Sequence, residues 1–138
     1  MYLIDTNVIS ELRKAKAGKA DKNVTAWAAG IPPSQLFLSV ITILELEIGI
    51  LLVERRDKQQ GATLRSWLNK YVLPSFSERI LAIDTAVAQH CATLHVPNPR
   101  SDRDALIAAT ALAHKMTVVT RNVADFDFMG VATNNPWN

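Results

Sequence analysis

The chain has 138 residues, of which 49% are hydrophobic and 20% are charged, with 15 Lys and Arg against 13 Asp and Glu. This length supports one globular domain with a substantial core and excludes two domains of ordinary size. The near-balance of charge says little about partners, so the positions of the charged residues matter more than their sum. The single cysteine, Cys91, excludes an intrachain disulfide. With no secretion signal at the start, we expect a cytoplasmic location.

The first predicted strand, Tyr2–Asp5, ends on a carboxylate with no turn before it. A carboxylate at the edge of a core costs free energy unless something compensates for its charge. One reading is that Asp5 or Thr6 caps the helix predicted over Asn7–Leu12. The other is that Asp5 belongs to a functional site.

A basic run, RKAKAGKADK, follows the first predicted helix and contains Arg13, Lys14, Lys16 and Lys19. Such groups contact phosphates without reading a base sequence, so the run is a candidate RNA contact. The alternative is a solvated mobile loop. The next helix is predicted over Val24–Ala29, with Asn23 as its N-cap.

The segment Gln35–Val53 is nearly long and apolar enough to span a bilayer. It carries Glu45 and Glu47 near its middle, and each costs about 2.5–3.5 kcal/mol in a membrane. We therefore predict a strand, Leu36–Ser39, followed by a helix, Thr42–Arg56, and no association with a membrane.

The predicted helix Thr42–Arg56, with the residue before it, is apolar on two sides. One stripe, taken as the inward one, contains Glu45 among Ile41, Leu44, Ile48 and Leu52. The opposite stripe is also apolar and consists of Ile43, Leu46, Ile50 and Val53. That second stripe is either internal core or a surface covered by another chain, and the latter predicts a homodimer. Glu47 and Glu54 share a third flank and are expected to be solvated or paired.

The second half of the chain alternates helices with strands. The predicted helices are Ala62–Tyr71, Thr85–His95 and Asp102–Lys115, and the strands are Ile80–Ile83, Thr117–Thr120 and, more weakly, Val131–Thr133. Asp84 and Ser101 stand where N-caps belong. The alternation predicts one α/β domain over residues 1–138, with a parallel sheet of four or five strands and helices on both faces.

Two further polar residues are placed by this topology near Asp5. Asp104 lies in the first turn of its helix on the side of the core, whereas Asp102 faces away and suits the helix dipole. Asn122 comes just after the strand Thr117–Thr120. Because ligands gather beyond the carboxyl ends of parallel strands, Asp5 and Asn122 are expected at the same edge.

Three inward carboxylates, Asp5, Glu45 and Asp104, therefore stand at element boundaries that can meet. Two like charges about 5 Å apart repel by roughly 3 kcal/mol at an effective dielectric near 20. Either one carboxyl is protonated or a cation lies between them. Oxygen ligands without His or Cys at ligand spacing favour Mg²⁺, or Mn²⁺, over zinc.

Four motifs in register, YLIDTNVISEL, SVITILELEIGI, DRDALIAATALAH and VVTRNVADF, resemble those of a PIN-domain ribonuclease. More narrowly, the chain resembles a VapC/FitB-like toxin of a bacterial type II toxin–antitoxin system. The resemblance implies a Mg²⁺-dependent endoribonuclease with Asp5 and Asp104 as metal ligands and Glu45 as a third catalytic residue. It also favours Asn122 at the fourth catalytic position, where the family is often acidic. Asp125 is the alternative there, unless it is only a capping-box partner of Asn122.

The resemblance also implies partners. RNA is the substrate, and Arg121 beside the site joins Arg13, Lys14, Lys16 and Lys19 as an expected RNA contact. A cognate VapB/FitA-like antitoxin is expected to block the site, by inserting an arginine among the carboxylates. Operator DNA is expected only through that antitoxin, because the chain has no helix-turn-helix signal.

Two other functions compete with the nuclease. One is a non-catalytic binding module whose acidic pocket captures a partner's arginine. The other is a Mg²⁺-dependent phosphatase with Asp5 as nucleophile, which is disfavoured because Asn7 stands where such enzymes carry a second aspartate. Loss of metal-dependent cleavage in Asp5→Asn would separate the nuclease from the binding module.

Overall fold

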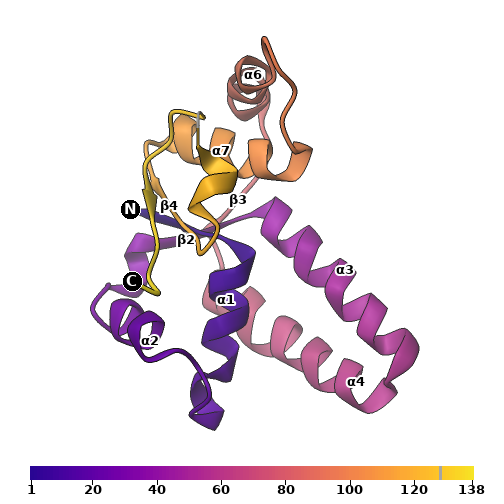
Figure 1. The fold of residues 1–138 in the computed structure, drawn as a ribbon. Helices are drawn as coiled ribbons and strands as arrows, with labels where there is room; N and C mark the ends of the chain where they lie inside the picture. Colours follow the sequence, from indigo (N-terminus) through magenta and orange to yellow (C-terminus); the bar gives the residue numbers. More distant parts are fainter. Residues whose placement is uncertain (128) are drawn as a thin grey trace.

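A five-stranded, all-parallel sheet forms the centre of the computed structural model, which describes residues 1–127 and 129–138. The strands are β1 (Tyr2–Ile4), β2 (Leu36–Ser39), β3 (Ile80–Leu81), β4 (Thr117–Val119) and β5 (Thr133–Asn134). Their spatial order is β3-β2-β1-β4-β5, so β1 lies in the middle (Figure 1). Leu3 pairs with Phe37 on one side and with Val118 on the other. The predicted parallel sheet is confirmed. The strands β1, β3 and β4 end earlier than predicted, β2 has its predicted bounds, and β5 begins only at the last residue of its predicted range.

Helices cover both faces of this sheet. They are α1 (Thr6–Leu12), α2 (Lys22–Ala29), α3 (Val40–Arg56), α4 (Lys58–Trp67), α5 (Leu73–Ser75), α6 (Thr85–Leu94) and α7 (Asp102–His114). Shorter turns of helix are η1 (Arg13–Ala17), η2 (Pro33–Gln35), η3 (Leu68–Val72) and η4 (Val123–Phe126). Alternate residues of β1 point to opposite faces. Ile4 packs in the core with Val8 and Leu46, while Leu3 packs in the core with Ile107 and Met116.

The strand order creates a switch point beside β1. The chain moves from β1 to β2 and β3 on one side and then crosses to β4 and β5 on the other. Ligand sites form outside the carboxyl ends of the strands at such a point. Asp5 ends β1, α3 begins directly after β2, and Thr120 follows β4.

Ile41 is buried as predicted, but beyond it the face of α3 that enters the core is the opposite of the one we predicted. Leu46 and Ile50 are buried, while Leu44 and Ile48 are 46% and 39% exposed. The reason is the hairpin that α3 forms with α4 (Figure 1), because Leu64 and Trp67 of α4 pack on the core that contains Leu46. A helix that is apolar on both sides carries no periodic signal to distinguish these faces.

The predicted helix caps are partly wrong. Asp21, not Asn23, caps α2, and its carboxylate accepts hydrogen bonds from the backbone N–H groups of Asn23 and Val24. Asp84 caps α6 as predicted. Ser101 stands at the N-cap position of α7 without a capping bond from its side chain.

The segment Gln35–Val53 has to be considered as a membrane span because of its apolar length. Within residues 1–127 and 129–138, no helix is both long and apolar enough to cross a membrane. The segment instead divides into β2 and most of α3, as predicted.

Candidate active site

Asp5 is held at the carboxyl end of β1 by hydrogen bonds from three directions. Its backbone N–H donates to the Val119 carbonyl over 2.9 Å, which continues the ladder between β1 and β4. One carboxylate oxygen accepts from the Thr6 N–H at 2.8 Å. The other accepts from the Thr120 hydroxyl at 2.8 Å and from the Asn7 amide at 3.3 Å. The capping interpretation is therefore correct for one carboxylate oxygen of Asp5, whereas Thr120 and Asn7 orient the other.

Burial has a chemical consequence for Asp5, whose exposed fraction is only 6%. Loss of hydration raises the pKa of Asp5 above its ordinary value. Hydrogen bonds from Thr120 and Thr6 oppose the rise, and the charge of Glu45 adds to it. The contribution of Glu45 shows that the two carboxylates lie within each other's field.

Glu45 projects from α3 toward α1. The Thr6 hydroxyl donates to Glu45 Oε1 at 2.6 Å, and Arg103 Nε lies 3.9 Å from Glu45 Oε2. Its side chain is 25% exposed, so it borders the site and is not sealed in the core. Glu47 is different, because Arg65 pairs with both Glu47 and Glu54 on the predicted third flank.

Asp104 lies in the first turn of α7 and is half-buried. Burial raises the pKa of Asp104 above its ordinary value, and the charges of Asp125, Asp5 and Glu45 raise it further, in that order. A hydrogen bond from Ser101 opposes the rise. The structure therefore brings the three predicted carboxylates into one electrostatic cluster and adds Asp125 to it.

Asn122 lies on the rim of this cluster. Its backbone N–H donates to the Thr120 hydroxyl at 3.0 Å, and its carbonyl accepts from the Asp125 N–H at 3.0 Å. Its side chain is exposed and makes no capping bond to η4. Asp125 contributes more to the pKa of Asp104 than Asp5 does, so the acidic character of this corner comes from Asp125.

The carboxylates of this cluster suit a hard divalent cation, but they do not form a preformed metal-binding cage. In the part of the chain that the structure describes, no three Asp, Glu, His or Cys side chains are close enough to hold a metal alone. Mg²⁺ does not need such a cage, because it usually binds one or two carboxylates and completes its shell with waters and substrate phosphates. Burial raises the pKa values of Asp5 and Asp104, and nearby carboxylates raise them further. In the described part of the chain, neither aspartate forms an ion pair with Lys, Arg or His. Two such oxygen ligands suit Mg²⁺ or Mn²⁺.

The predicted RNA contacts fall in different places. Lys14 pairs with Glu11 at 3.2 Å, and Lys19 is exposed. The Arg121 backbone N–H donates to the Asn7 side chain at 3.1 Å, and the Arg121 guanidinium carbon lies 5.1 Å from the centre of the Trp137 ring. Arg13 and Lys16 belong to η1, so this part of the run is a helical turn and not an irregular loop.

Four polar residues of the site were not predicted: Thr6, Asn7, Thr120 and Arg103. Thr120 bonds to Asp5, Thr6 and Arg103 contact Glu45, and Asn7 contacts both Asp5 and Arg121. The sequence signal for them was adjacency, because each stands next to a predicted site residue or within two positions of one. Their roles depend on contacts between distant segments, which adjacency alone does not specify.

The sequence matches the PIN domain over residues 2–129. The chain belongs to the PIN domain family. Over its whole length this PIN domain is 35% identical to Toxin FitB of Neisseria gonorrhoeae, and it covers 99% of that protein. It is also 34% identical to VapC ribonuclease Y4jK of Sinorhizobium fredii, with 99% of this chain and 98% of that protein aligned.

The fold comparison agrees with the sequence comparison. The structure of FitAB bound to an IR36 DNA fragment matches this PIN domain with a TM-score of 0.89 and 34% identity. The match covers 100% of this chain and 96% of that one. The predicted resemblance to PIN domains of the VapC/FitB group is confirmed.

Proposed function

We propose that this PIN domain is the toxin of a bacterial toxin–antitoxin module and an endoribonuclease that hydrolyses RNA phosphodiester bonds with a divalent metal ion. The observation that carries the proposal is the cluster of Asp5, Glu45 and Asp104 at the switch point of the sheet, with raised pKa values at both aspartates. Full-length similarity to Toxin FitB and to a VapC ribonuclease supports it. We propose that residues 1–138 act as one functional unit.

Each side chain has a role in this reaction. Asp5 and Asp104 would hold Mg²⁺ or Mn²⁺, which would supply an activated water and charge neutralisation at the phosphate. Thr120 and Asn7 fix the orientation of Asp5 through their bonds to its second oxygen. Glu45, held through its Oε1 by Thr6, orients the attacking water and accepts its proton. Asn122 and Asp125 border the fourth corner, where the amide of Asn122 holds a water.

Basic groups at the rim offset the repulsion between the acidic site and RNA. The backbone of Arg121 is linked to Asp5 through Asn7, and its guanidinium lies over the Trp137 ring. Arg13 lines a cavity of about 340 Å³ together with Thr6 and Glu45. Lys14, Lys16 and Lys19 extend the positive charge along and just beyond η1. These groups contact phosphates and raise affinity without selecting a sequence.

An antitoxin is the second proposed partner. A guanidinium inserted among the carboxylates of Asp5, Glu45 and Asp104 forms charge-assisted hydrogen bonds and displaces the metal. The similarity to FitB, solved as FitAB on a DNA fragment, supports a VapB/FitA-like antitoxin that carries the complex to operator DNA. We place the protein in the bacterial cytoplasm, which agrees with its single, reduced Cys91.

A homodimer is the third proposed assembly, and we propose that it forms through the outer face of α3 and not through the originally predicted stripe. The outer face of α3 exposes aliphatic side chains at helical spacing, namely Val40, Leu44, Ile48, Leu51 and Leu52. Leu46 and Ile50 of the originally predicted stripe are core residues instead. A continuous apolar face of this kind favours a two-fold contact with the same face of a second copy.

The deciding experiment is a digest of total RNA by the purified chain with Mg²⁺ or Mn²⁺, with cleavage ends mapped by sequencing. We expect cleavage that stops in EDTA and is lost in Asp104→Asn, since the variant keeps the shape of the side chain and removes its charge. Metal-independent cleavage, or full activity of Asp104→Asn, would contradict the proposal. No cleavage by the parent under any metal would favour the alternative of an arginine-capturing binding module.

A further inference from the structure

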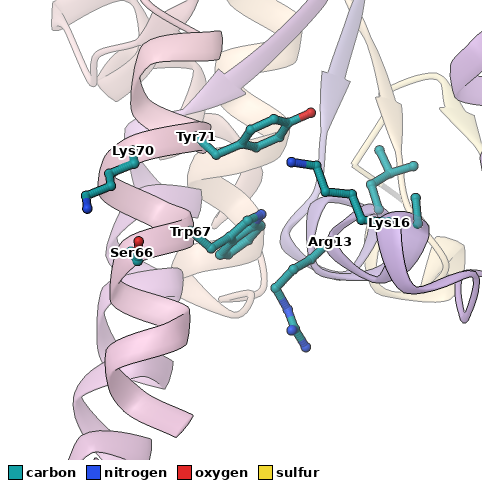
Figure 2. Close-up of a pocket in the computed structure, with 8 residues that line it drawn as sticks. Arg13, Lys16, Ser66, Trp67, Lys70 and Tyr71 are labelled. Atoms are coloured by element: carbon teal, nitrogen blue, oxygen red, sulfur yellow. The ribbon is translucent and has the colours of Figure 1, made fainter. Parts of the chain in front are cut away.

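A basic and aromatic cleft lies between η1 and the end of α4 together with η3, which follows α4 directly. Its volume is about 400 Å³. In Figure 2, Trp67 and Tyr71 project from the α4–η3 segment toward Arg13 and Lys16 of η1. Lys70 and Ser66 line the same cleft. None of the aromatic residues or Lys70 has a role in the site described above.

Cations stand over both aromatic rings of the cleft. The Arg13 guanidinium carbon is 6.0 Å from the centre of the Trp67 ring, and the Lys16 ammonium is 5.0 Å from the centre of the Tyr71 ring. Among residues 1–127 and 129–138, no carboxylate forms an ion pair with Arg13, Lys16 or Lys70. The cleft therefore has two uncompensated positive charges beside its aromatic faces, and Lys70 adds a third at its rim, with its ammonium directed away from the rings (Figure 2). This combination favours an anionic ligand that also has planar groups.

The shape of the helix contributes to this arrangement. Residues Leu68–Val72 form a turn of π-helix, in which the Leu73 N–H donates to the Leu68 carbonyl. Pro74 follows and cannot donate to the Lys70 carbonyl, which accounts for the wider turn. Tyr71 lies in this turn and is 52% exposed, although a ring of this size is usually better buried. A π-turn interrupts regular packing at a cost, and such turns occur frequently at functional sites.

The cleft adjoins a cavity that reaches Glu45 of the acidic site. A second cavity, of about 340 Å³, is lined by Thr6 and Glu45 at one end and by Arg13 and Trp67 at the other. Arg13 and Trp67 also line the basic and aromatic cleft. The shared residues give a chain bound in the cleft a route past Trp67 toward Glu45.

We propose that this cleft is a subsite for single-stranded RNA, in which unpaired bases stack on Trp67 and Tyr71 while Arg13, Lys16 and Lys70 contact the phosphates. The inference rests on the proposed ribonuclease function and extends it to the nucleotides beside the scissile bond. Proteins bind single strands by this combination, because every base has a face for stacking and every linkage has a charge. An apolar protein segment would bury the three cations without partners, so the charges favour RNA over such a segment.

Binding of a fluorescein-labelled, single-stranded RNA octamer, followed by fluorescence anisotropy, tests the subsite apart from cleavage. It is done in the full chain carrying Asp104→Asn, so that the RNA stays intact. We expect Tyr71→Ala to weaken binding by about tenfold, in line with the loss of one stacked base, and Tyr71→Phe to restore it. Because Tyr71 is half-exposed, its truncation leaves the core intact, and an unchanged melting temperature verifies this.

The charged residues give a second readout. The double variant Lys16→Ala/Lys70→Ala should reduce the slope of log affinity against log salt by about 0.7 for each phosphate that is no longer neutralised. Lys58→Ala is the matched control, because Lys58 is exposed at the other end of α4 and does not line the cleft. The same octamer as a duplex should bind more weakly and should not respond to Tyr71→Ala.

The outcomes separate the subsite from the ribonuclease function. Octamer affinity that is unchanged in both Tyr71→Ala and Lys16→Ala/Lys70→Ala overturns the subsite, and it leaves the cleft as a face for protein docking. Weakened octamer binding in those variants supports the subsite even if the parent cleaves no RNA. In an active parent, Tyr71→Ala should raise KM for long RNA by a larger factor than KM for a dinucleotide.

Discussion

The Thr120 hydroxyl donates to the Asp5 carboxylate over 2.8 Å, and the two residues are 115 positions apart in the chain. The bond joins the carboxyl ends of β1 and β4, where the same hydroxyl also accepts from the Asn122 N–H. It connects the most deeply buried carboxylate of the site to the segment that carries Asn122 and Asp125. The geometry of the acidic cluster therefore depends on one small side chain that bears no charge.

Thr120→Val should destabilise the protein and shift the pH dependence of its activity. Without the hydroxyl, buried Asp5 loses its strongest hydrogen-bond donor, at a cost of about 1–3 kcal/mol in the free energy of unfolding measured with urea. The same loss should raise the pKa of Asp5 further, so the acidic limb of the pH–rate profile moves to higher pH. Thr120→Ser keeps the hydroxyl and should behave like the parent. Equal stability of Thr120→Val and the parent would contradict a role for this bond.

Asp104→Asn should stabilise the metal-free protein at neutral pH. The folded-state pKa of Asp104 is raised above 3.8, so between that value and the raised pKa the native state binds more protons than the unfolded state. Stability therefore falls as pH increases through this window, and the full penalty remains above it. In EDTA at pH 7, the melting temperature of the variant should exceed that of the parent by about 2 °C or more. The loss of the favourable interaction between the Asp104 charge and the α7 dipole reduces this gain. Its melting temperature should also depend less on pH.

A lower melting temperature of EDTA-treated Asp104→Asn would mean that Asp104 has a structural role. Asp5→Asn is a weaker version of this test. The Asp5 carboxylate accepts three hydrogen bonds, and an amide in its place would direct an N–H group toward the Asn7 amide or the Thr6 N–H. Relief of charge repulsion would then raise the melting temperature of Asp5→Asn, while the loss of hydrogen bonds would lower it.

Two glycines of the α3–α4 hairpin should respond oppositely to alanine. Gly49 is in the interior of α3, with no atom within 4 Å of an added Cβ, so Gly49→Ala should raise the free energy of unfolding by about 0.5–1 kcal/mol. Gly61 packs against α3, and a Cβ there would lie 2.7 Å from the Cα of Glu54. Gly61→Ala should therefore destabilise the protein, by about 1–3 kcal/mol. Thermal or urea unfolding of the two variants measures both signs, and the same sign for both would contradict this packing.

Leu44→Glu combined with Leu52→Glu should convert the proposed dimer into a monomer. These side chains are 46% and 58% exposed, so charging them leaves the core intact but opposes contact between two α3 faces. Light scattering coupled to gel filtration gives the mass, and Val96→Glu is the control, since Val96 is 75% exposed and lies outside α3. A parent that runs as a monomer at high concentration would disprove the interface. Leu46→Glu is unsuitable because Leu46 is in the core.

Local patterns in the sequence determined the α/β class, the approximate positions of the strands and the three carboxylates of the site. Each of these depends on near neighbours in the chain. Asp5 ends an apolar strand, Glu45 sits between aliphatic residues of one helix, and Asp104 lies in a first helical turn. The four motifs that resemble PIN domains are also contiguous stretches, so they were readable without a structure.

Only the tertiary structure decided which partners these elements meet. The α3–α4 hairpin selected Leu46 and Ile50 for the core and left Leu44 and Ile48 exposed, because α3 is apolar on both sides and its periodicity permits either choice. The bond between Thr120 and Asp5, and the placing of Arg13 over Trp67, join residues far apart in the chain. Such contacts follow from how the sheet orders its strands and how helices pack on it, and no local pattern specifies them.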